Sequence, residues 1–162
     1  MTDRMEPFRL FVYGTLMRGE RNHARFCGGG VGFREAAIWG RLFDLPAGYP
    51  ALLIPQQSIM ATGTLDPVAD AQRQAEVGCD WPQRPEGDWD IVHGELVEFA
   101  TPSRDMPPID ELEEFVPDGS GLYRRVLVSV MVGAECAAAW VYCMDATPQG
   151  VRLPDGRWLG CR

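Results

Sequence analysis

The sequence predicts a single α+β domain whose mixed β-sheet is closed or strongly bent and carries few helices. Its 162 residues suit one domain with one sizeable core. Hydrophobic residues make up 46% and charged residues 23%, as in an ordinary globular protein. Short apolar runs between turn signals predict about five or six strands, whereas few segments have helical spacing. This balance favours a small closed or bent sheet over a helical bundle.

The first predicted strand lies in Phe8–Leu16 and ends in a sharp turn at Tyr13-Gly14-Thr15. An apolar run that ends in glycine is typical of a buried strand followed by a tight turn. Gly14 lets a ligand approach the main chain closely, and successive N–H groups in such a turn can converge on an anion or a carbonyl oxygen. Taken alone, these residues favour a plainer interpretation, an ordinary junction between a strand and a loop.

A short helix is predicted within Met17–Cys27, and Gly28–Gly30 ends it. Three consecutive glycines break a helix, but they do not form a phosphate-binding loop. The GxGxxG and P-loop patterns are both missing, and the whole chain contains no lysine. Nucleotide binding through these motifs is therefore not predicted.

The rest of the sheet is predicted from five further segments. The clearest of them, Leu122–Val132, places apolar residues on one face with period two, and the Gly133-Ala134 turn lets the next segment pair with it. Gly94 lies inside another segment, where a glycine often marks a bulge or the close approach of another backbone. The five segments are Glu35–Leu45, Ala51–Ile54, Ile91–Phe99, Leu122–Val132 and Cys136–Cys143.

Residues 55–90 are the least regular part of the chain, and we expect them to be an insertion into the single domain that spans residues 1–162. The segment is rich in proline and contains one plausible helix near Ala69–Val77. Trp81 and Trp89 lie among polar residues here, so they either pack over an edge of the core or line the mouth of a ligand site. Packing is the favoured alternative. A lid over the site is one role that the insertion could take.

The formal net charge of −8 argues against non-specific binding to nucleic acid or to an anionic membrane, because both need a basic surface. No signal peptide is visible, and no apolar run is long enough to span a bilayer. We therefore expect a soluble, cytoplasmic protein. The five cysteines are odd in number and form no CxxC motif, so reduced thiols are expected instead of a disulfide framework. They are Cys27, Cys79, Cys136, Cys143 and Cys161, of which Cys136 and Cys143 lie in apolar runs and are expected to be buried.

A helix is predicted over Ile109–Val116, after two prolines that suit its start. Each residue of a helix turns by about 100°, so Glu113 falls about 40° from Ile109 and inside the apolar stripe that Leu112 extends. The other acidic residues fall on the opposite, solvent-facing side of the helix. They are Asp110, Glu111 and Glu114.

A carboxylate on a buried face must be hydrogen-bonded or have a raised pKa. Burial, together with the charges of Asp110 and Glu114, would raise the pKa of Glu113. A glutamate tuned in this way suits general acid–base catalysis. The alternative is a glutamate at the margin of the stripe whose carboxylate reaches water or an arginine such as Arg124 or Arg125. For a single amphipathic helix, that alternative is favoured.

Five motifs follow one another along the chain: Val12–Leu16, Gly40–Leu45 with Gly48–Leu52, Val92–Leu96, Ile109–Glu113, and Leu122–Val126. In order and approximate spacing they resemble the γ-glutamylcyclotransferase-like superfamily, which includes the AIG2-like and BtrG-like proteins. Each motif alone is weak, but five in order are specific. The resemblance covers most of the chain outside residues 55–90.

The resemblance implies a small mixed β-barrel with few peripheral helices. It also implies a cyclotransferase that converts a γ-glutamyl amine or γ-glutamyl amino acid to 5-oxoproline and releases the amine. Glu113 matches the catalytic glutamate of the family's LDxxEG pattern. The family usually has glycine after this glutamate, whereas Glu114 stands here, which affects the local backbone and charge. The implied substrate-binding residues are Tyr13, Gly14, Thr15 and Leu16, which match the YGTL loop, and Tyr123, which matches a tyrosine near the cavity.

In the implied reaction the α-amine of the substrate attacks its own γ-carbonyl, and Glu113 takes a proton from the amine and returns it to the leaving group. Main-chain N–H groups of the turn would hold either the oxyanion or the α-carboxylate. No metal or organic cofactor is expected, since His23 and His93 show no ligand spacing with the cysteines. The expected partner is a small γ-glutamyl molecule, without nucleic acid or membrane.

Two other functions remain open on the sequence. A non-catalytic binding protein could keep the same cavity, which Glu114 and residues 55–90 could alter. A thiol enzyme could use Cys27 or Cys79, although for Cys27 no histidine or helix-start context that would activate it is evident.

Overall fold

The protein is described by a computed structural model that covers residues 6–159. One mixed sheet dominates it, with the strand order β3-β2-β5-β1-β7-β6-β4 and β8 beside β2. β1 and β7 run parallel, whereas β1 pairs with β5, and β6 with β7, in the antiparallel sense. The strands are β1 (Phe8–Val12), β2 (Gly30–Asp44), β3 (Pro50–Leu53), β4 (Ala61–Thr62), β5 (Asp90–Phe99), β6 (Arg124–Val132), β7 (Glu135–Cys143) and β8 (Val151–Arg152).

β1 is the central strand, between β5 and β7. Its side chains enter both halves of the core: Phe8 and Leu10 pack in one hydrophobic cluster, and Phe11 packs in the other. A strand that is buried on both faces needs a continuous apolar run, which is why no alternation is visible here. A Cβ at Gly94 of β5 would run into the carbonyl oxygen of Val12, so the predicted close approach is confirmed.

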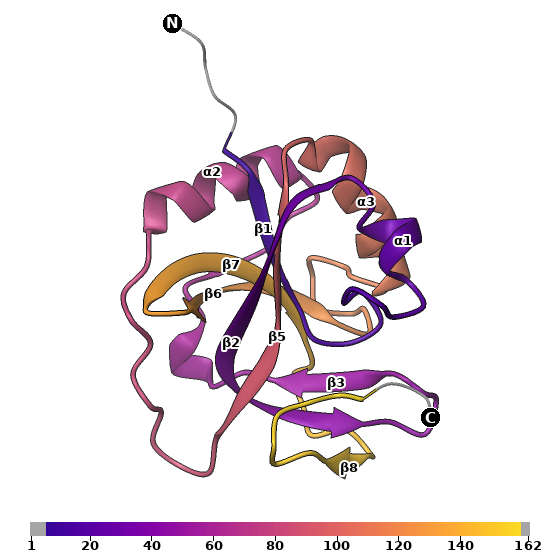
Figure 1. Ribbon diagram of the computed structural model, residues 1–162, viewed down its shortest axis with the longest axis vertical. Helices are drawn as coiled ribbons and strands as arrows, with labels where there is room; N and C mark the ends of the chain where they lie inside the picture. Colours follow the sequence, from indigo (N-terminus) through magenta and orange to yellow (C-terminus); the bar gives the residue numbers. More distant parts are fainter. Residues whose placement is uncertain (1–5, 160–162) are drawn as a thin grey trace, which may run out of the picture.

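The α-helices are few and lie together at one end of the molecule (Figure 1). α2 packs against α3 and β1, and α1 lies against α3. Among the described residues, no helix is long and apolar enough to cross a membrane. The mixed sheet with few helices thus agrees with the predicted fold class. The helical elements are α1 (His23–Phe26), the 3₁₀ turn η1 (Gln56–Ser58), α2 (Pro67–Val77) and α3 (Pro102–Leu112).

The boundaries predicted for the acidic helix are wrong. α3 begins at Pro102 and ends at Leu112, so the two prolines expected at its start lie inside it. Proline suits the first turn, and Pro102 supplies that start instead. Phe115 N–H bonds the Asp110 carbonyl at 2.9 Å, and Glu114 N–H bonds that of Glu111 at 3.1 Å. This pair of bonds is the Schellman arrangement, which ends the helix one turn earlier than the spacing predicts.

Residues 55–90 are more regular than expected, because they contain η1, β4 and α2. The helix predicted near Ala69–Val77 is confirmed, and it begins two residues earlier, at Pro67. Asp66 caps it by accepting a bond from the Ala69 N–H at 3.1 Å. Gln74 of α2 ties the segment to β1 through bonds to the Arg9 N–H and the Pro7 carbonyl. The longest stretch without helix or strand is the part after α2, residues 78–89.

Candidate active site

A cavity of about 210 Å³ opens where the end of β1, the end of α3 and the start of β6 meet. Its wall contains every site residue that the family resemblance implied, brought together from three distant stretches of the chain. It also contains residues that the sequence did not single out, among them Asn22, Tyr49 and Tyr142. Among the described residues, none of residues 55–90 lines this cavity. Trp81 and Trp89 therefore do not line it either. The predicted site residues on the wall are Tyr13, Gly14, Thr15, Leu16, Glu113 and Tyr123.

The Tyr13–Leu16 turn is held in shape by bonds to its carbonyl oxygens. Met17 N–H bonds the Gly14 carbonyl at 3.0 Å, and Asn22 N–H bonds the Thr15 carbonyl at 2.9 Å. The Asn22 side chain also donates to the Thr15 hydroxyl at 2.9 Å. Within residues 6–159, no group accepts a hydrogen bond from the N–H of Gly14, Thr15 or Leu16. The turn therefore offers main-chain donors beside the cavity.

Gly14 is required by the packing of the wall. A Cβ at this position would lie 2.5 Å from Cγ of Pro50, which is far too close for two unbonded carbon atoms. Pro50 lines the same cavity at the start of β3, and its carbonyl accepts a bond from the Tyr123 hydroxyl at 2.8 Å. The glycine thus brings β3, and the tyrosine fixed to it, against the turn.

Both predicted site tyrosines, Tyr13 and Tyr123, donate hydrogen bonds from their hydroxyl groups to main-chain carbonyls across the cavity. Tyr13 donates to the carbonyl of Tyr142 at 2.6 Å, across from β1 to β7. Burial raises the pKa of both Tyr13 and Tyr123, and the Glu113 charge adds to it. Both phenols are therefore neutral donors at physiological pH. Tyr123 faces the cavity as the resemblance implies.

Glu113 follows the last residue of α3 and is half-buried in the cavity wall. Its carboxylate has no hydrogen-bond or ion-pair partner among the described residues. Burial, with the Asp110 charge as the second cause, raises the pKa of Glu113 from 4.5 to about 7. Neither Arg124 nor Arg125 reaches it, because these arginines bind Asp145 and Asp110. The expected raised pKa is present, although Glu113 is half-buried and Glu114 is not among the causes.

Glu114 has φ +49°, and it is the single non-glycine residue with positive φ among those described. This is the left-handed conformation that glycine favours at the position after a helix cap. Glutamate therefore adopts here a backbone conformation that the family's usual glycine would adopt without strain. Glu114 is exposed and lies on the cavity wall.

Asp110 was expected to face solvent, and this expectation is wrong. Its carboxylate is buried and accepts bonds from Tyr142 Oη at 2.5 Å and from Arg125 Nε at 3.0 Å. Arg125 is fully buried and also donates to Asp70 at 2.8 Å. Its guanidinium lies over the rings of Phe115 and Trp140, at 4.7 and 5.5 Å from their centroids. This ion cluster joins residues that are far apart in the chain and fixes the end of α3. The helical spacing of the sequence could not predict it, because spacing contains no information about distant partners.

The thiols do not support a cysteine nucleophile. Cys27 is buried, and burial raises its pKa to about 12, the reverse of what an activated thiol needs. Neither Cys27 nor Cys79 lines the cavity. Residues 6–159 contain no group of three or more histidine, cysteine or acidic side chains that could hold a metal ion.

Comparison with known proteins identifies the family. The family model for "Gamma-glutamyl cyclotransferase, AIG2-like" matches residues 10–77 and 78–160. This chain belongs to the AIG2-like gamma-glutamyl cyclotransferase family. The match includes the irregular residues 78–89, which the motif resemblance had left out.

Two curated relatives of this AIG2-like chain carry related names. Gamma-L-glutamyl-butirosin B gamma-glutamyl cyclotransferase of Niallia circulans is 29% identical over 82% of this chain, which spans 64% of that protein. A putative gamma-glutamylcyclotransferase of Halalkalibacterium halodurans is 27% identical, over 88% of this chain and 91% of the relative. The crystal structure of YkqA from Bacillus subtilis superposes with a TM-score of 0.58 at 20% identity. That superposition covers 94% of this chain and 39% of YkqA, and it shows the shared fold.

Proposed function

We propose that this protein is a cyclotransferase that converts a γ-glutamyl amine or γ-glutamyl amino acid to 5-oxoproline and the free amine. Glu113 is the general acid–base, and the Tyr13–Leu16 turn binds the glutamyl group. The observation that carries the proposal is the unpaired carboxylate of Glu113, with a pKa of about 7, on the same cavity as the turn's unpaired N–H groups. A group with this pKa can both accept and return a proton near neutral pH.

In the first step the carboxylate of Glu113 takes a proton from the α-ammonium group of the substrate. The free amine attacks the γ-carbonyl carbon and closes a five-membered ring, which requires the substrate to be held in a folded conformation. The carbonyl oxygen becomes an oxyanion. The protonated Glu113 then gives its proton to the γ-amide nitrogen, and the bond between this nitrogen and the γ-carbon breaks. Glu113 takes the second proton from the ring nitrogen, which becomes the neutral lactam nitrogen, and passes that proton to the released amine. The products are 5-oxoproline and an amine, and Glu113 is again a carboxylate.

Charge placement supports this division of roles. The N–H groups of Gly14, Thr15 and Leu16 are suited to an anionic oxygen, either the oxyanion or the α-carboxylate of the substrate. Tyr13 and Tyr123 stay neutral and keep their protons, so they add no negative charge. A cavity of about 210 Å³ suits a glutamyl group, with the leaving amine directed towards the rim.

We also infer that the sheet is a small closed barrel. Support comes from a further pairing, Ala37 of β2 with Met131 of β6, in addition to the linear strand order. With this pairing, the order β2-β5-β1-β7-β6 returns to β2, which removes the free edges of these strands.

The experiment is a measurement of 5-oxoproline release by mass spectrometry over a library of γ-glutamyl amines and γ-glutamyl amino acids. We expect turnover of at least one member and a loss of 10²-fold or more in Glu113→Gln, which keeps the shape and removes the base. Glu111→Gln is the matched control, since Glu111 lies two residues earlier at the end of α3, is exposed and does not line the cavity. Full turnover in Glu113→Gln would remove this residue from its role. Thermal stabilisation by a library member without any product would favour a binding protein instead.

A further inference from the structure

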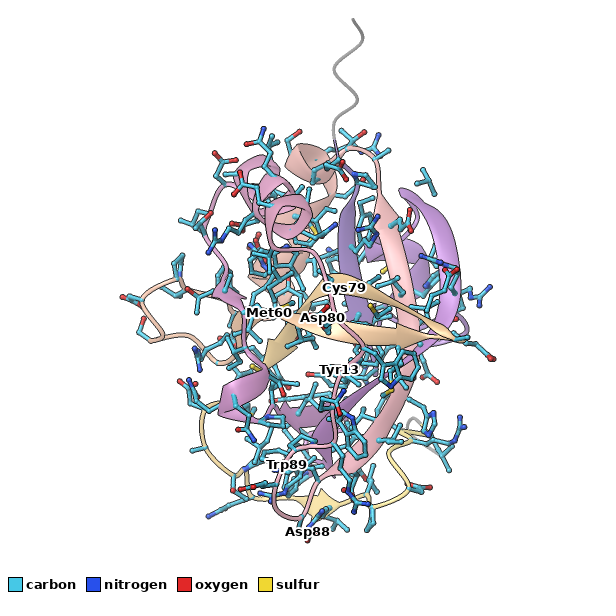
Figure 2. The ribbon with its side chains drawn as sticks, turned by 90° about the vertical axis from the view of Figure 1, so that its left-hand side faces the viewer. Tyr13, Met60, Cys79, Asp80, Asp88 and Trp89 are labelled. Atoms are coloured by element: carbon cyan, nitrogen blue, oxygen red, sulfur yellow. The ribbon has the colours of Figure 1, made fainter. Side chains whose placement is uncertain are left out.

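Two cysteines that the proposed reaction does not use are in direct contact. Sγ of Cys79 lies 2.7 Å from Sγ of Cys136, although 57 residues separate them in the chain. Cys79 follows the end of α2, and Cys136 is near the start of β7. Figure 2 shows Cys79 on the segment that leaves α2 and passes across the β6–β7 hairpin. A disulfide bond is about 2.0 Å long, so a movement of less than ~1 Å would bring these two sulfur atoms to bonding distance.

The pair is accessible from outside. Both cysteines line a surface cleft of about 410 Å³, whose rim includes Arg9, Arg34 and Glu135. Each of the two is half-buried, whereas Cys27 and Cys143 are buried. A small thiol reagent can therefore reach the pair while the other two described cysteines stay protected.

We propose that Cys79 and Cys136 form a reversible intramolecular disulfide with low-molecular-weight disulfides as the oxidant. One cysteine thiolate attacks a sulfur of the reagent, forms a mixed disulfide and displaces one thiolate. The thiolate of the second cysteine then attacks the sulfur atom of the first cysteine and displaces the remaining reagent thiolate. Two protein thiols and one reagent disulfide thus become one protein disulfide and two reagent thiols, and each protein sulfur loses one electron.

The surroundings favour a stable bond over a reactive thiol. Burial raises the pKa of Cys79 to about 11, and the hydrogen bond with Cys136 adds to the shift. No stabilised thiolate opposes oxidation here, and the high thiol pKa makes exchange slow. The bond would fasten the start of residues 78–89 to the hairpin, and it would restrict the unfolded chain, so the oxidised protein should melt at a higher temperature.

The probe for this site is oxidised glutathione, added to the fully reduced chain before quenching with an alkylating agent. Mass spectrometry of the intact protein should show the loss of two hydrogen atoms and two thiols that escape alkylation. Peptide mapping should link the peptide of Cys79 to that of Cys136. Tm should rise on oxidation and return to its first value on reduction.

The single variants Cys79→Ser and Cys136→Ser should each take up one glutathione at the remaining cysteine and show no rise in Tm. Cys143→Ser is the matched control and should form the same linkage as the wild type. The proposal is overturned if the wild type keeps stable glutathione adducts at Cys79 and Cys136, if it remains unmodified, or if the mapped linkage involves Cys161 or another cysteine.

Discussion

The carboxylate of Asp110 accepts two hydrogen bonds from the guanidinium of Arg125, at 3.0 and 3.2 Å, three residues before Glu113 in the chain. Arg125 also binds Asp70 of α2, so one buried cation fastens α2 and α3 to β6. The same carboxylate raises the pKa of Glu113. The interaction that positions the end of α3 therefore also contributes to the proton affinity of the proposed base.

Stability should depend on pH through Glu113. Between pH 4.5 and about 7, the folded chain holds a proton on Glu113 that the unfolded chain has released. The wild type therefore loses stability as pH rises through this window, by roughly 3 kcal/mol at most. In Glu113→Gln this loss is absent, so the variant should match the wild type near pH 4 and melt higher at pH 8. Thermal unfolding across this range, with Glu111→Gln as the control, measures the difference; parallel curves would contradict the raised pKa.

Asp110→Asn should shift the pH dependence of catalysis. The base must be ionised to accept a proton, so kcat/KM should rise with pH through about 7 in the wild type. Without the Asp110 charge this limb should move towards acid pH, while it stays above 4.5 because burial remains. Tyr142→Phe removes the hydrogen bond to Asp110 and keeps the charge, so its limb should stay in place. Identical limbs in wild type and Asp110→Asn would show that Asp110 does not act on Glu113.

Arg125→Met should be among the most destabilising single changes. It leaves Asp70 and Asp110 buried without their cation, which typically costs about 3–5 kcal/mol. The neighbouring Arg124 pairs with the exposed Asp145, so Arg124→Met should cost no more than about 1 kcal/mol. Urea unfolding of both variants measures the contrast. Equal losses would mean that the buried cluster contributes little.

Glu114→Gly should stabilise the chain although it removes a side chain. The left-handed conformation costs a non-glycine residue about 1–2 kcal/mol, part of which is offset by the greater freedom of glycine in the unfolded state. We expect a net gain of about 0.5–1 kcal/mol. Glu111→Gly, inside α3, should instead cost about 1 kcal/mol. Chemical denaturation distinguishes the two, and a loss in Glu114→Gly would mean that the Glu114 side chain contributes to stability.

Gly14→Ala should reduce both activity and stability. The new methyl group would push against the ring of Pro50 and displace the wall that carries Tyr123. Overpacking of this kind costs about 1–3 kcal/mol. Gly32→Ala on β2 is the control, because the nearest atom to its Cβ is 3.9 Å away. 5-Oxoproline release and Tm measure the two effects, and wild-type values in Gly14→Ala would show that the wall adjusts freely.

Much of the fold was encoded locally. Apolar runs bounded by turn residues predicted each long strand within a few residues, since such patterns depend on neighbours in the chain. The spacing of Glu113 from Ile109 raised the possibility of an unusual carboxylate, but on spacing alone the plainer alternative was favoured, and the family resemblance was needed to prefer the other. The break at Gly14 predicted the turn that now lies on the same cavity, although the roles of both residues stay predictions.

Tertiary structure decided what depended on partners far away in the chain. Residue spacing predicted that the helix ends at Val116, but a Schellman motif ends α3 at Leu112. Spacing also predicted that Asp110 faces solvent, but hydrogen bonds from Arg125 and Tyr142 hold its carboxylate inside the protein. The contact between Cys79 and Cys136 likewise joins residues from separate elements. A sequence pattern reports which face of an element is apolar. Which charged group or sulfur atom from another element contacts that face is determined only by the tertiary packing.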